Sequence, residues 1–375
     1  MEALFQGFLS LTWQQAVMIG IGLTLVWLAV AKEYEPSLLL PMGFGTVLVN
    51  IPMTAALTQA MDGTVVPGAI SVLFDAGIAN EMFPLLIFIG IGAMMDFSPV
   101  MERPVYALFG LTAQAGIFLT MGLAYYVFGF SVREAASIGI IGAADGPTSI
   151  FVSSRFAPQL LGPISVAAYS YMSMVPVIQP PVVRALTTKE ERRMNMTLRA
   201  GRTVSKRARI LFPIVVTIVV GIFAPSSSTL IGFLMFGNLL RESGVVARLS
   251  NSAQNELANI VTIMLGLGIS CTMTGDRFLR ADTLMILGMG LVAFVFDTAG
   301  GVLSAKLLNL FMKEKINPMI GAAGISAFPM SSRTIQQMAA REKPGTFVLM
   351  QASAANVAGQ IGSVVAGGLL LALLS

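Results

Sequence analysis

The sequence predicts an all-α polytopic membrane protein made of two inverted repeats, each with a re-entrant arm formed by a broken helix. Of the 375 residues, 55% are hydrophobic and only 11% are charged, whereas a soluble domain carries about 25% charged residues. The mean hydropathy is +0.80. In addition, two broken segments occupy corresponding positions in the two halves, a pattern typical of secondary transporters. We expect roughly nine full spans plus two hairpin arms.

The first arm, residues 142–155, reads Gly-Ala-Ala-Asp-Gly-Pro-Thr-Ser-Ile-Phe-Val-Ser-Ser-Arg. Gly146 and Pro147 interrupt the helical hydrogen bonds directly after a carboxylate, Asp145. Within a membrane, such a break is tolerated only where it is buried in protein or lines a cavity. A carboxylate at this depth costs free energy, so Asp145 indicates a functional site.

The second arm, residues 321–333, repeats the same frame with one residue fewer and places Ser326 near the position of Asp145. The two arms are 179 residues apart, and two further matches occur in the same order at offsets of 176 and 192 residues. Together these matches predict an internal repeat. The further pairs are residues 88–92 with 264–268 and residues 44–48 with 236–240.

Apolar runs define the expected spans along the chain. Residues 1–15 carry no Lys or Arg, so we interpret the first run as a retained helix and not as a signal peptide. Residues 53–80 also lack Lys and Arg, as expected of an outside loop. Several runs are shorter than the ~20 residues that a simple span needs, which predicts interrupted helices. The runs are 15–31, 38–51, 83–95, 105–130, 160–178, 210–223, 230–239, 257–273, 284–310 and 347–374.

A basic linker, residues 184–209, separates an N-terminal membrane repeat (1–183) from a C-terminal one (210–375). It holds nine Lys or Arg against two Glu, a local charge of +7 in a chain whose net charge is +4. The positive-inside rule places such a loop in the cytoplasm. A surface for anionic membrane lipid or for a partner is compatible with this, and nucleic acid is not needed to explain it. Re-entrant arms would place residues 313–315 on the same side.

Asp145 is the strongest candidate for a cation ligand. Hard cations prefer oxygen ligands, and Thr148, Ser149, Ser326 and Asn317 offer such oxygens at the same expected depth. Burial disfavours a charged carboxylate and a bound cation favours it, so one carboxylate can hold either a proton or a cation. The alternative is that Asp145 pairs with an arginine and only stabilises the fold.

Other polar residues allow two readings. The chain has no histidine, so protons must move through Asp, Glu, Tyr or water. Tyr169 and Tyr171 face different sides of a helix, and either one serves chemistry or only packing. Arg155 and Arg333 end the two arms, where an arginine can bind a substrate carboxylate or mark the membrane boundary.

Two further features are weaker candidates for a functional role. Ser353, Asn356, Gln360 and Ser363 form one polar helical stripe, which helix packing explains. Asp297 is a second acid within an apolar run, but no broken backbone lies beside it.

The single cysteine, Cys271, excludes internal disulfides and Cys-based metal clusters. Zincin, triad and nucleotide-binding motifs are also absent from the sequence.

Four runs of the sequence resemble the β subunit of the sodium-translocating, biotin-dependent decarboxylases, a family that includes oxaloacetate, methylmalonyl-CoA, glutaconyl-CoA and malonate systems. The Gly-Ala-Ala-Asp-Gly-Pro-Thr run is the most specific, and the resemblance covers nearly the whole chain. The runs are residues 90–97, residues 142–148, residues 171–181 and residues 317–333.

The resemblance implies an activity. A member of this family decarboxylates carboxybiotin carried by a partner, exports Na⁺ and consumes a proton. Its partners would be a biotin carrier protein, a carboxyltransferase α subunit and a small γ/δ membrane subunit, in the inner cell membrane of a prokaryote, and a homo-oligomer is compatible with this. The chain is shorter than the oxaloacetate type, which favours the CoA-ester members.

The resemblance also implies roles for particular residues. The essential aspartate falls on Asp145, the functional tyrosine on Tyr171, and residues of the family's second arm on Asn317, Ser326 and Arg333. Because carboxybiotin is presented as a carboxylate, we expect Arg333 to bind it and to take part in catalysis. From the oxygen chemistry of the residues, we expect the metal ligands to be Asp145, Thr148, Asn317 and Ser326. Gly321 matches a further residue of the family's second arm.

A stand-alone sodium/carboxylate or sodium/proton secondary transporter remains the alternative, because it too requires broken arms and an oxygen-rich site. Neighbouring genes for a biotin carrier and a carboxyltransferase would distinguish the two.

Overall fold

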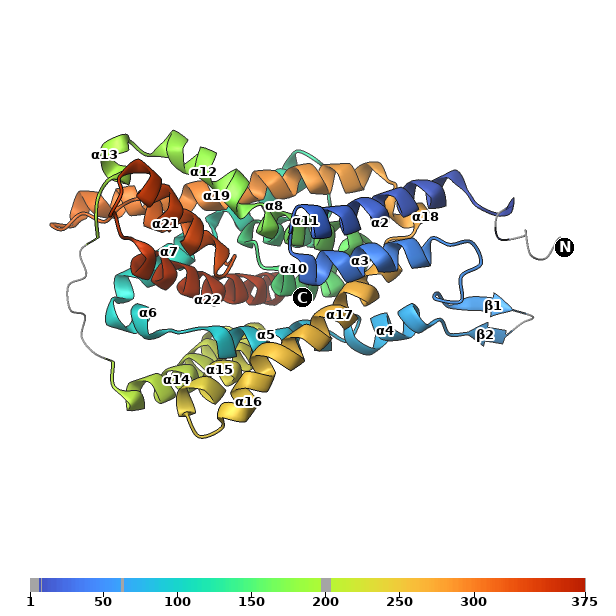
Figure 1. Cartoon of the computed structure of the whole chain (residues 1–375), viewed down its shortest axis with the longest axis horizontal. Helices are drawn as coiled ribbons and strands as arrows, with labels where there is room; N and C mark the ends of the chain where they lie inside the picture. Colours follow the sequence, from blue (N-terminus) through green and yellow to red (C-terminus); the bar gives the residue numbers. More distant parts are fainter. Residues whose placement is uncertain (1–6, 8, 62–63, 197–203, 375) are drawn as a thin grey trace.

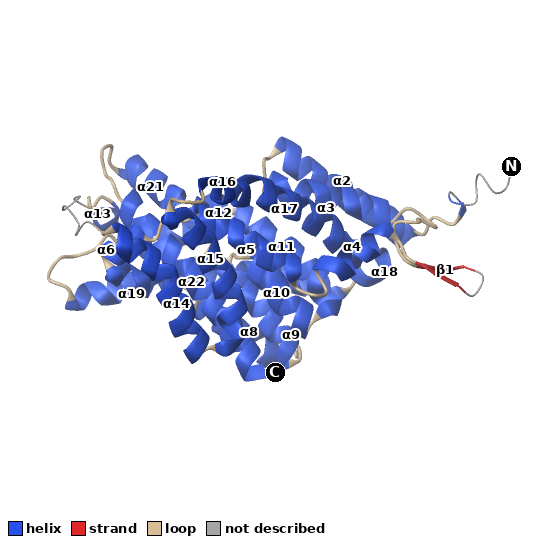
Figure 2. Cartoon of the chain, turned by 90° about the horizontal axis from the view of Figure 1, so that it is seen from below, coloured by secondary structure: helices blue, strands red, loops and turns tan. Residues whose placement is uncertain are grey.

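The computed structural model describes residues 7, 9–61, 64–196 and 204–374. Its regular structure in these residues is helical apart from one antiparallel hairpin, formed by β1 (Gln59–Met61) and β2 (Thr64–Val66). The hairpin projects from one end of the molecule (Figure 2). The all-α class is therefore confirmed, and the hairpin lies within the segment that the sequence predicts to be an outside loop.

The longest helices follow the long axis of the molecule (Figure 1). They include α2 (Trp13–Ala31), α19 (Ala281–Phe311) and α22 (Leu349–Leu374). The remaining elements of the first half are α3 (Pro36–Val49), α4 (Ala69–Gly77), α5 (Met82–Met94), α6 (Ser98–Glu102), η1 (Pro104–Tyr106), α7 (Ala107–Thr112), α8 (Ala115–Tyr126), α9 (Val132–Gly139), η2 (Ile140–Ala143), α10 (Gly146–Phe156), η3 (Pro158–Leu160), α11 (Leu161–Ser173), α12 (Val175–Leu186) and α13 (Lys189–Arg192).

The second half contains a similar series of helices. These are α14 (Lys206–Phe223), η4 (Pro225–Ser227), α15 (Ser228–Ser243), α16 (Ala247–Ser252), the π-turn η5 (Ala253–Leu257), α17 (Ala258–Ile269), η6 (Ser270–Thr272), α18 (Gly275–Phe278), α20 (Met319–Ala322) and α21 (Met330–Glu342).

Five helical segments of the described chain are long and apolar enough to cross a membrane. Two bent pairs raise this number to seven if each is one span: α4 with α5, bent by 63°, and α11 with α12, bent by 69°. A polytopic membrane protein is confirmed. The count of roughly nine spans stays a prediction, because several expected spans form short helices such as the 14-residue α3, which contains Pro41. The five segments are Trp13–Ala31, Pro104–Tyr126, Ala247–Thr272, Ala281–Phe311 and Leu349–Leu374.

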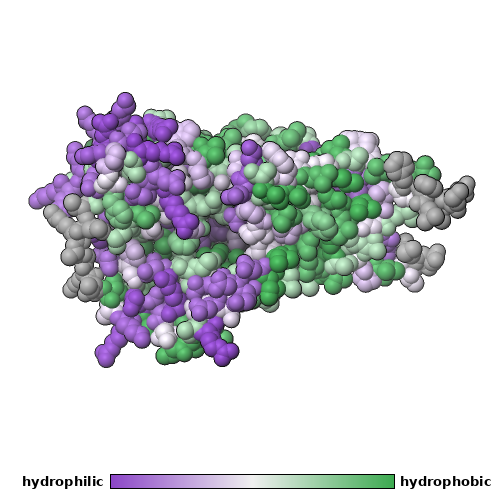
Figure 3. Space-filling model, in the orientation of Figure 1, coloured by the Kyte–Doolittle hydropathy of each residue, from purple (hydrophilic) through white to green (hydrophobic). Residues whose placement is uncertain are grey.

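Charge gathers at one end of the molecule. Hydrophilic side chains cover the end that holds α13 and α21, and hydrophobic ones cover the half that holds α2 and α3 (Figure 3). An ion pair of 3.2 Å between Lys306 of α19 and Glu191 of α13 holds the end of α19 beside the basic linker. The basic linker and the end of α19 therefore lie at the same end of the molecule. Residues 197–203 of the linker lie outside the described part.

Glycines bring the helices that position the site into close contact. Gly301 of α19 and Gly321 of α20 lie so close that a Cβ on either would overlap the carbonyl group of the other. Such contacts let backbones approach where larger side chains would separate them. They fix the start of the second arm against the longest helix of the protein.

Candidate functional site

The first arm breaks at an N-cap. After η2, Ala144 takes a left-handed conformation with a φ of +53°, and α10 begins at Gly146. The Asp145 carboxylate accepts hydrogen bonds from the backbone N–H of Thr148 (3.4 Å) and from its Oγ1 (2.6 Å). Asp is a favoured N-cap residue, and Pro147 is tolerated in the first turn, where the backbone N–H has no helical partner. The sequence therefore ends one helix and starts another around Asp145.

The second arm breaks between α20 and α21, which frees the carbonyl groups of residues 322–326. Side-chain amides from two other helices, α12 and α22, and from the α7–α8 junction bind four of these groups. Their N–H groups donate to these carbonyls in an apolar environment, where an unpaired backbone group costs free energy. The bonds run from Gln179 to Ala322 (2.8 Å), from Gln114 to Gly324 (3.4 Å), from Asn356 to Ile325 (2.6 Å) and from Gln360 to Ser326 (2.5 Å).

The two breaks meet in the middle of the molecule, where α10 and α22 lie (Figure 1). The backbone N–H of Ser326 donates to the carbonyl of Ala143 over 2.9 Å, which joins the second arm to the first. Ser363 of α22 donates from its Oγ to Oδ2 of Asp145 over 2.7 Å. The hydroxyl of Ser326 is held by the carbonyl of Gly359 at 2.7 Å. Both arms and α22 thus converge on Asp145.

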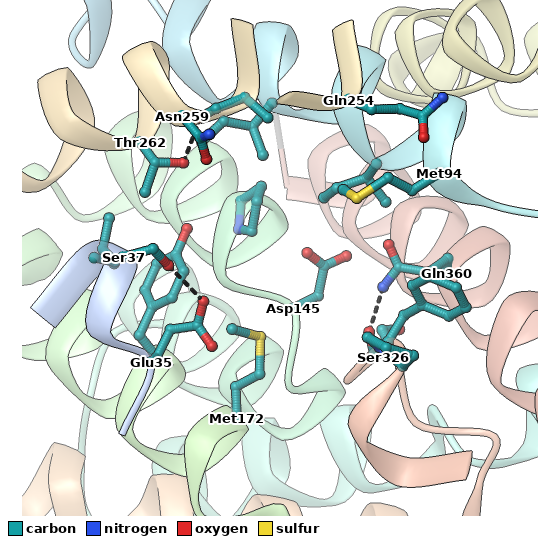
Figure 4. Close-up of a pocket in the computed structure, with 18 residues that line it drawn as sticks. Glu35, Ser37, Met94, Asp145, Met172, Gln254, Asn259, Thr262, Ser326 and Gln360 are labelled. Atoms are coloured by element: carbon teal, nitrogen blue, oxygen red, sulfur yellow. Dashed lines mark hydrogen bonds between the residues drawn. The ribbon is translucent and has the colours of Figure 1, made fainter. Parts of the chain in front are cut away.

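A cavity of about 330 Å³ opens beside this centre. Asp145 and Glu35 both point into it from different sides (Figure 4). No Lys or Arg occurs among the residues that line it, so two carboxylates are present without a basic partner. Its other polar lining residues are Ser37, Tyr169, Gln254, Asn259, Thr262, Ser326 and Gln360. A cavity that holds two carboxylates and no basic side chain favours a cation over an anion.

Known proteins are similar to this sequence along nearly its whole length. A family described as "Na+-transporting oxaloacetate decarboxylase beta subunit" matches residues 14–374. The chain belongs to this family. It is 47% identical to the methylmalonyl-CoA decarboxylase subunit beta of Propionigenium modestum, over 98% of this chain and 96% of that one.

Two other relatives of this β subunit are similar over nearly their whole length. The glutaconyl-CoA decarboxylase subunit beta of Acidaminococcus fermentans is 49% identical over 98% of this chain and 95% of its own. The oxaloacetate decarboxylase beta chain 2 of Salmonella typhi is 44% identical over 99% and 98%. The chain is therefore a subunit of a Na⁺-transporting decarboxylase, and the stand-alone transporter is not favoured.

In this β subunit, the structure brings together three of the predicted site residues, Asp145, Thr148 and Ser326. Asp145 is 2% exposed. Within the described residues, its carboxylate accepts hydrogen bonds from Thr148 and Ser363 and forms no ion pair. No arginine of the described residues therefore pairs with Asp145, which speaks against the alternative in which it only stabilises the fold.

Asn317 lies apart from the cavity. Its Oδ1 accepts from the N–H of Met319 (3.1 Å), and its Nδ2 donates to the carbonyl of Met194 (2.9 Å). The side chain thus starts α20 and ties it to the linker region. Arg333 is exposed on α21 and does not line the cavity either.

The two tyrosines face different sides, as their spacing predicts. The Tyr171 hydroxyl donates to the carbonyl of Leu287 in α19. Tyr169 lines the cavity instead, and a Cβ on Gly146 would overlap its ring. Gly146 is therefore required for the first arm to pack against α11.

Sequence reasoning missed three residues of the site. Gln360 and Ser363 belong to the polar stripe that the sequence assigns to helix packing, and their spacing of three places them on one face of α22. Glu35 lies in a short turn between α2 and α3, and its acidic character between two apolar runs was the available signal.

Proposed function

We propose that this β subunit decarboxylates carboxybiotin presented by a biotin carrier protein and couples the reaction to Na⁺ export with consumption of a proton. The observation that carries the proposal is the buried Asp145 at the meeting point of the two arms, beside a cavity lined without Lys or Arg. A carboxylate in such a place needs either a proton or a cation to offset its charge.

The cation site would consist of Asp145, Thr148 and Ser326, joined by the hydroxyl of Ser363. The Thr148 and Ser363 hydroxyls lie 2.6 and 2.7 Å from Asp145 Oδ2, and their lone pairs can also face a bound Na⁺. Asn317 is not included, because its side chain contacts Met319 and Met194 and no contact in the described chain joins it to Asp145. Na⁺ and a proton would compete for the same carboxylate, so entry of one releases the other.

The decarboxylation would use the released proton. The bond between the ureido nitrogen and the carboxylate carbon breaks, CO₂ leaves, and the nitrogen takes the proton that Na⁺ displaces from Asp145. Arg333 would anchor the carboxylate, since an exposed guanidinium is accessible to a group presented by a partner. Tyr171 would relay the proton. Tyr169 is a second candidate for the relay, because it lines the cavity of Asp145.

We also propose that the two halves are inverted repeats. Helix packing supports this: α3 packs on α17 and α5 packs on α15. In the predicted repeat α3 corresponds to α15 and α5 to α17. The contact between α3 and α17 is therefore the counterpart, in the repeat, of the contact between α15 and α5. A Cβ on Gly45 would contact Leu267 of α17, and one on Gly237 would overlap the carbonyl of Ile89 in α5.

The complex would include a carboxyltransferase α subunit and a small γ/δ membrane subunit, in the inner cell membrane of a prokaryote, and the chain is compatible with a homo-oligomer. We propose a CoA ester as the substrate of the whole complex. The methylmalonyl-CoA and glutaconyl-CoA relatives are 47–49% identical, and the oxaloacetate relatives 42–44%.

The test uses the purified complex in proteoliposomes, with carboxylated carrier protein and radiolabelled Na⁺. Decarboxylation that depends on Na⁺ and moves the label across the membrane is expected. Decarboxylation at the same rate without Na⁺ would contradict the proposal. Label movement without carboxylated carrier would favour a stand-alone transporter.

A further inference from the structure

We propose that Glu35 is a second cation-binding carboxylate of the Asp145 cavity, where Na⁺ is held on its way between the exterior of the cavity and Asp145. This inference rests on the proposed function and adds a residue that neither arm contains. The juxtaposition that carries it is Glu35 facing Asp145 across one cavity (Figure 4).

Glu35 is built into the cavity wall. It ends the turn between α2 and α3 and takes a left-handed backbone conformation with a φ of +36°, directly before Pro36. Ser37 donates from its Oγ to Glu35 Oε1 over 3.0 Å, which orients the carboxylate. Glu35 is partly exposed, whereas Asp145 is buried. Glu35 therefore lies nearer to solvent than Asp145 in the same cavity.

The charges around Glu35 favour a cation. Among the described residues no ion pair is formed by Glu35, and the neighbouring Lys32 lies over the ring of Trp27, 5.5 Å from its centroid. Tyr169, an uncharged side chain, lines the same cavity. Two carboxylates that share a poorly solvated cavity repel each other, and a cation between them removes this repulsion.

An independent observation points to a ligand. Gln360 is only 3% exposed and lines the cavity. Its Nε2 donates to the carbonyl of Ser326, which leaves Oε1 buried without a hydrogen-bond partner in the described chain. A buried carbonyl oxygen without a partner costs free energy. Amide oxygens are among the ligands that hard cations prefer, so a cation in the cavity would satisfy it.

The experiment compares Glu35→Gln with Glu33→Gln in the full complex. Glu33 lies in the same turn, is exposed and does not line the cavity, so it is a matched control. Radiolabelled Na⁺ binding and the Na⁺ concentration for half-maximal decarboxylation are measured for both. Glu35→Gln is expected to raise that concentration roughly tenfold, because one attractive charge is lost. Glu33→Gln is expected to leave it within twofold of the wild type.

Two further variants cover the case in which Glu35→Gln does not assemble. Glu35→Asp keeps the carboxylate and should stay within about threefold of the wild type. Ser37→Ala removes the hydroxyl that orients Glu35 and should raise the half-maximal Na⁺ concentration by about two- to threefold.

Three outcomes overturn the inference: an unchanged Na⁺ dependence in Glu35→Gln, an unchanged dependence in Ser37→Ala where Glu35→Gln does not assemble, or equal shifts in Glu35→Gln and Glu33→Gln. If Asp145→Asn still abolishes Na⁺-dependent turnover in these cases, only the role of Glu35 is wrong. If Asp145→Asn also retains it, the proposed function fails as well.

Discussion

The hydroxyl of Ser363 donates to Oδ2 of Asp145 over 2.7 Å, although the two residues are 218 positions apart in the chain. This bond joins α22 to the break of the first arm. Gln360, one turn earlier on α22, binds the second arm at Ser326. One face of a single helix therefore holds both arms, so movement of either arm is coupled to α22 and to the carboxylate of Asp145.

Ser363→Ala is expected to raise the Na⁺ concentration for half-maximal turnover by about five- to tenfold. The reason is the loss of one charge-assisted hydrogen bond, worth about 1–2 kcal/mol. Ser353→Ala is the control, because Ser353 lies in the same stripe of α22, whereas the hydrogen bonds to the Asp145 carboxylate in the described chain come from Thr148 and Ser363. Equal effects of the two variants would show that Ser363 acts on helix packing alone.

Ser326→Ala and Asn317→Ala should differ, although the sequence assigns both to the cation site. Ser326→Ala is expected to raise the Na⁺ requirement several-fold, since Ser326 lines the cavity. Asn317→Ala removes contacts to Met319 and Met194. It should instead lower the free energy of unfolding by about 1–3 kcal/mol, which is seen as a lower Tm. A raised Na⁺ requirement with unchanged Tm in Asn317→Ala would restore it as a ligand.

Gly146→Ala is expected to destabilise the protein by about 1–3 kcal/mol, because the added Cβ would overlap the ring of Tyr169. Gly122→Ala is the matched control, since nothing lies within 4 Å of a Cβ at that position. Thermal unfolding of the purified complex measures both. Equal Tm values for the two variants would show that the contact between the first arm and α11 is not tight.

Arg333→Ala should weaken the consumption of carboxybiotin at least tenfold, as expected when a bidentate anchor for a carboxylate is lost. Radiolabelled Na⁺ binding to the resting complex should change little, because Arg333 does not line the cavity. Arg341→Ala, on the same helix and also exposed, is the control. If Na⁺ binding is lost in Arg333→Ala while carboxybiotin is consumed normally, the assigned roles are wrong.

Tyr171→Phe and Tyr169→Phe identify the proton relay. The variant that removes the relay should slow turnover at saturating Na⁺ most strongly at high pH, where protons are scarce. Turnover is measured across a pH series with carboxylated carrier. Equal pH profiles of both variants and the wild type would exclude both tyrosines from the relay.

The positions of the breaks could be predicted from the sequence, because Gly and Pro after an acidic N-cap act locally. The distant partners of the breaks could not. A polar stripe such as Gln360 and Ser363 has the same spacing whether it faces another helix or a cavity. Asn317 shows the reverse case, since its side chain is used by a tertiary contact with Met194 that local sequence does not specify.

The most direct test of the cation site is Asp145→Asn in the assembled complex, in proteoliposomes with carboxylated carrier and radiolabelled Na⁺. The amide keeps the shape of the side chain but loses its charge and its titratable proton. We expect loss of Na⁺-dependent decarboxylation and of label transport, with the complex still assembled in the membrane. Normal Na⁺-coupled turnover in this variant would contradict the account and direct attention to Asp297, the other buried carboxylate of the described chain.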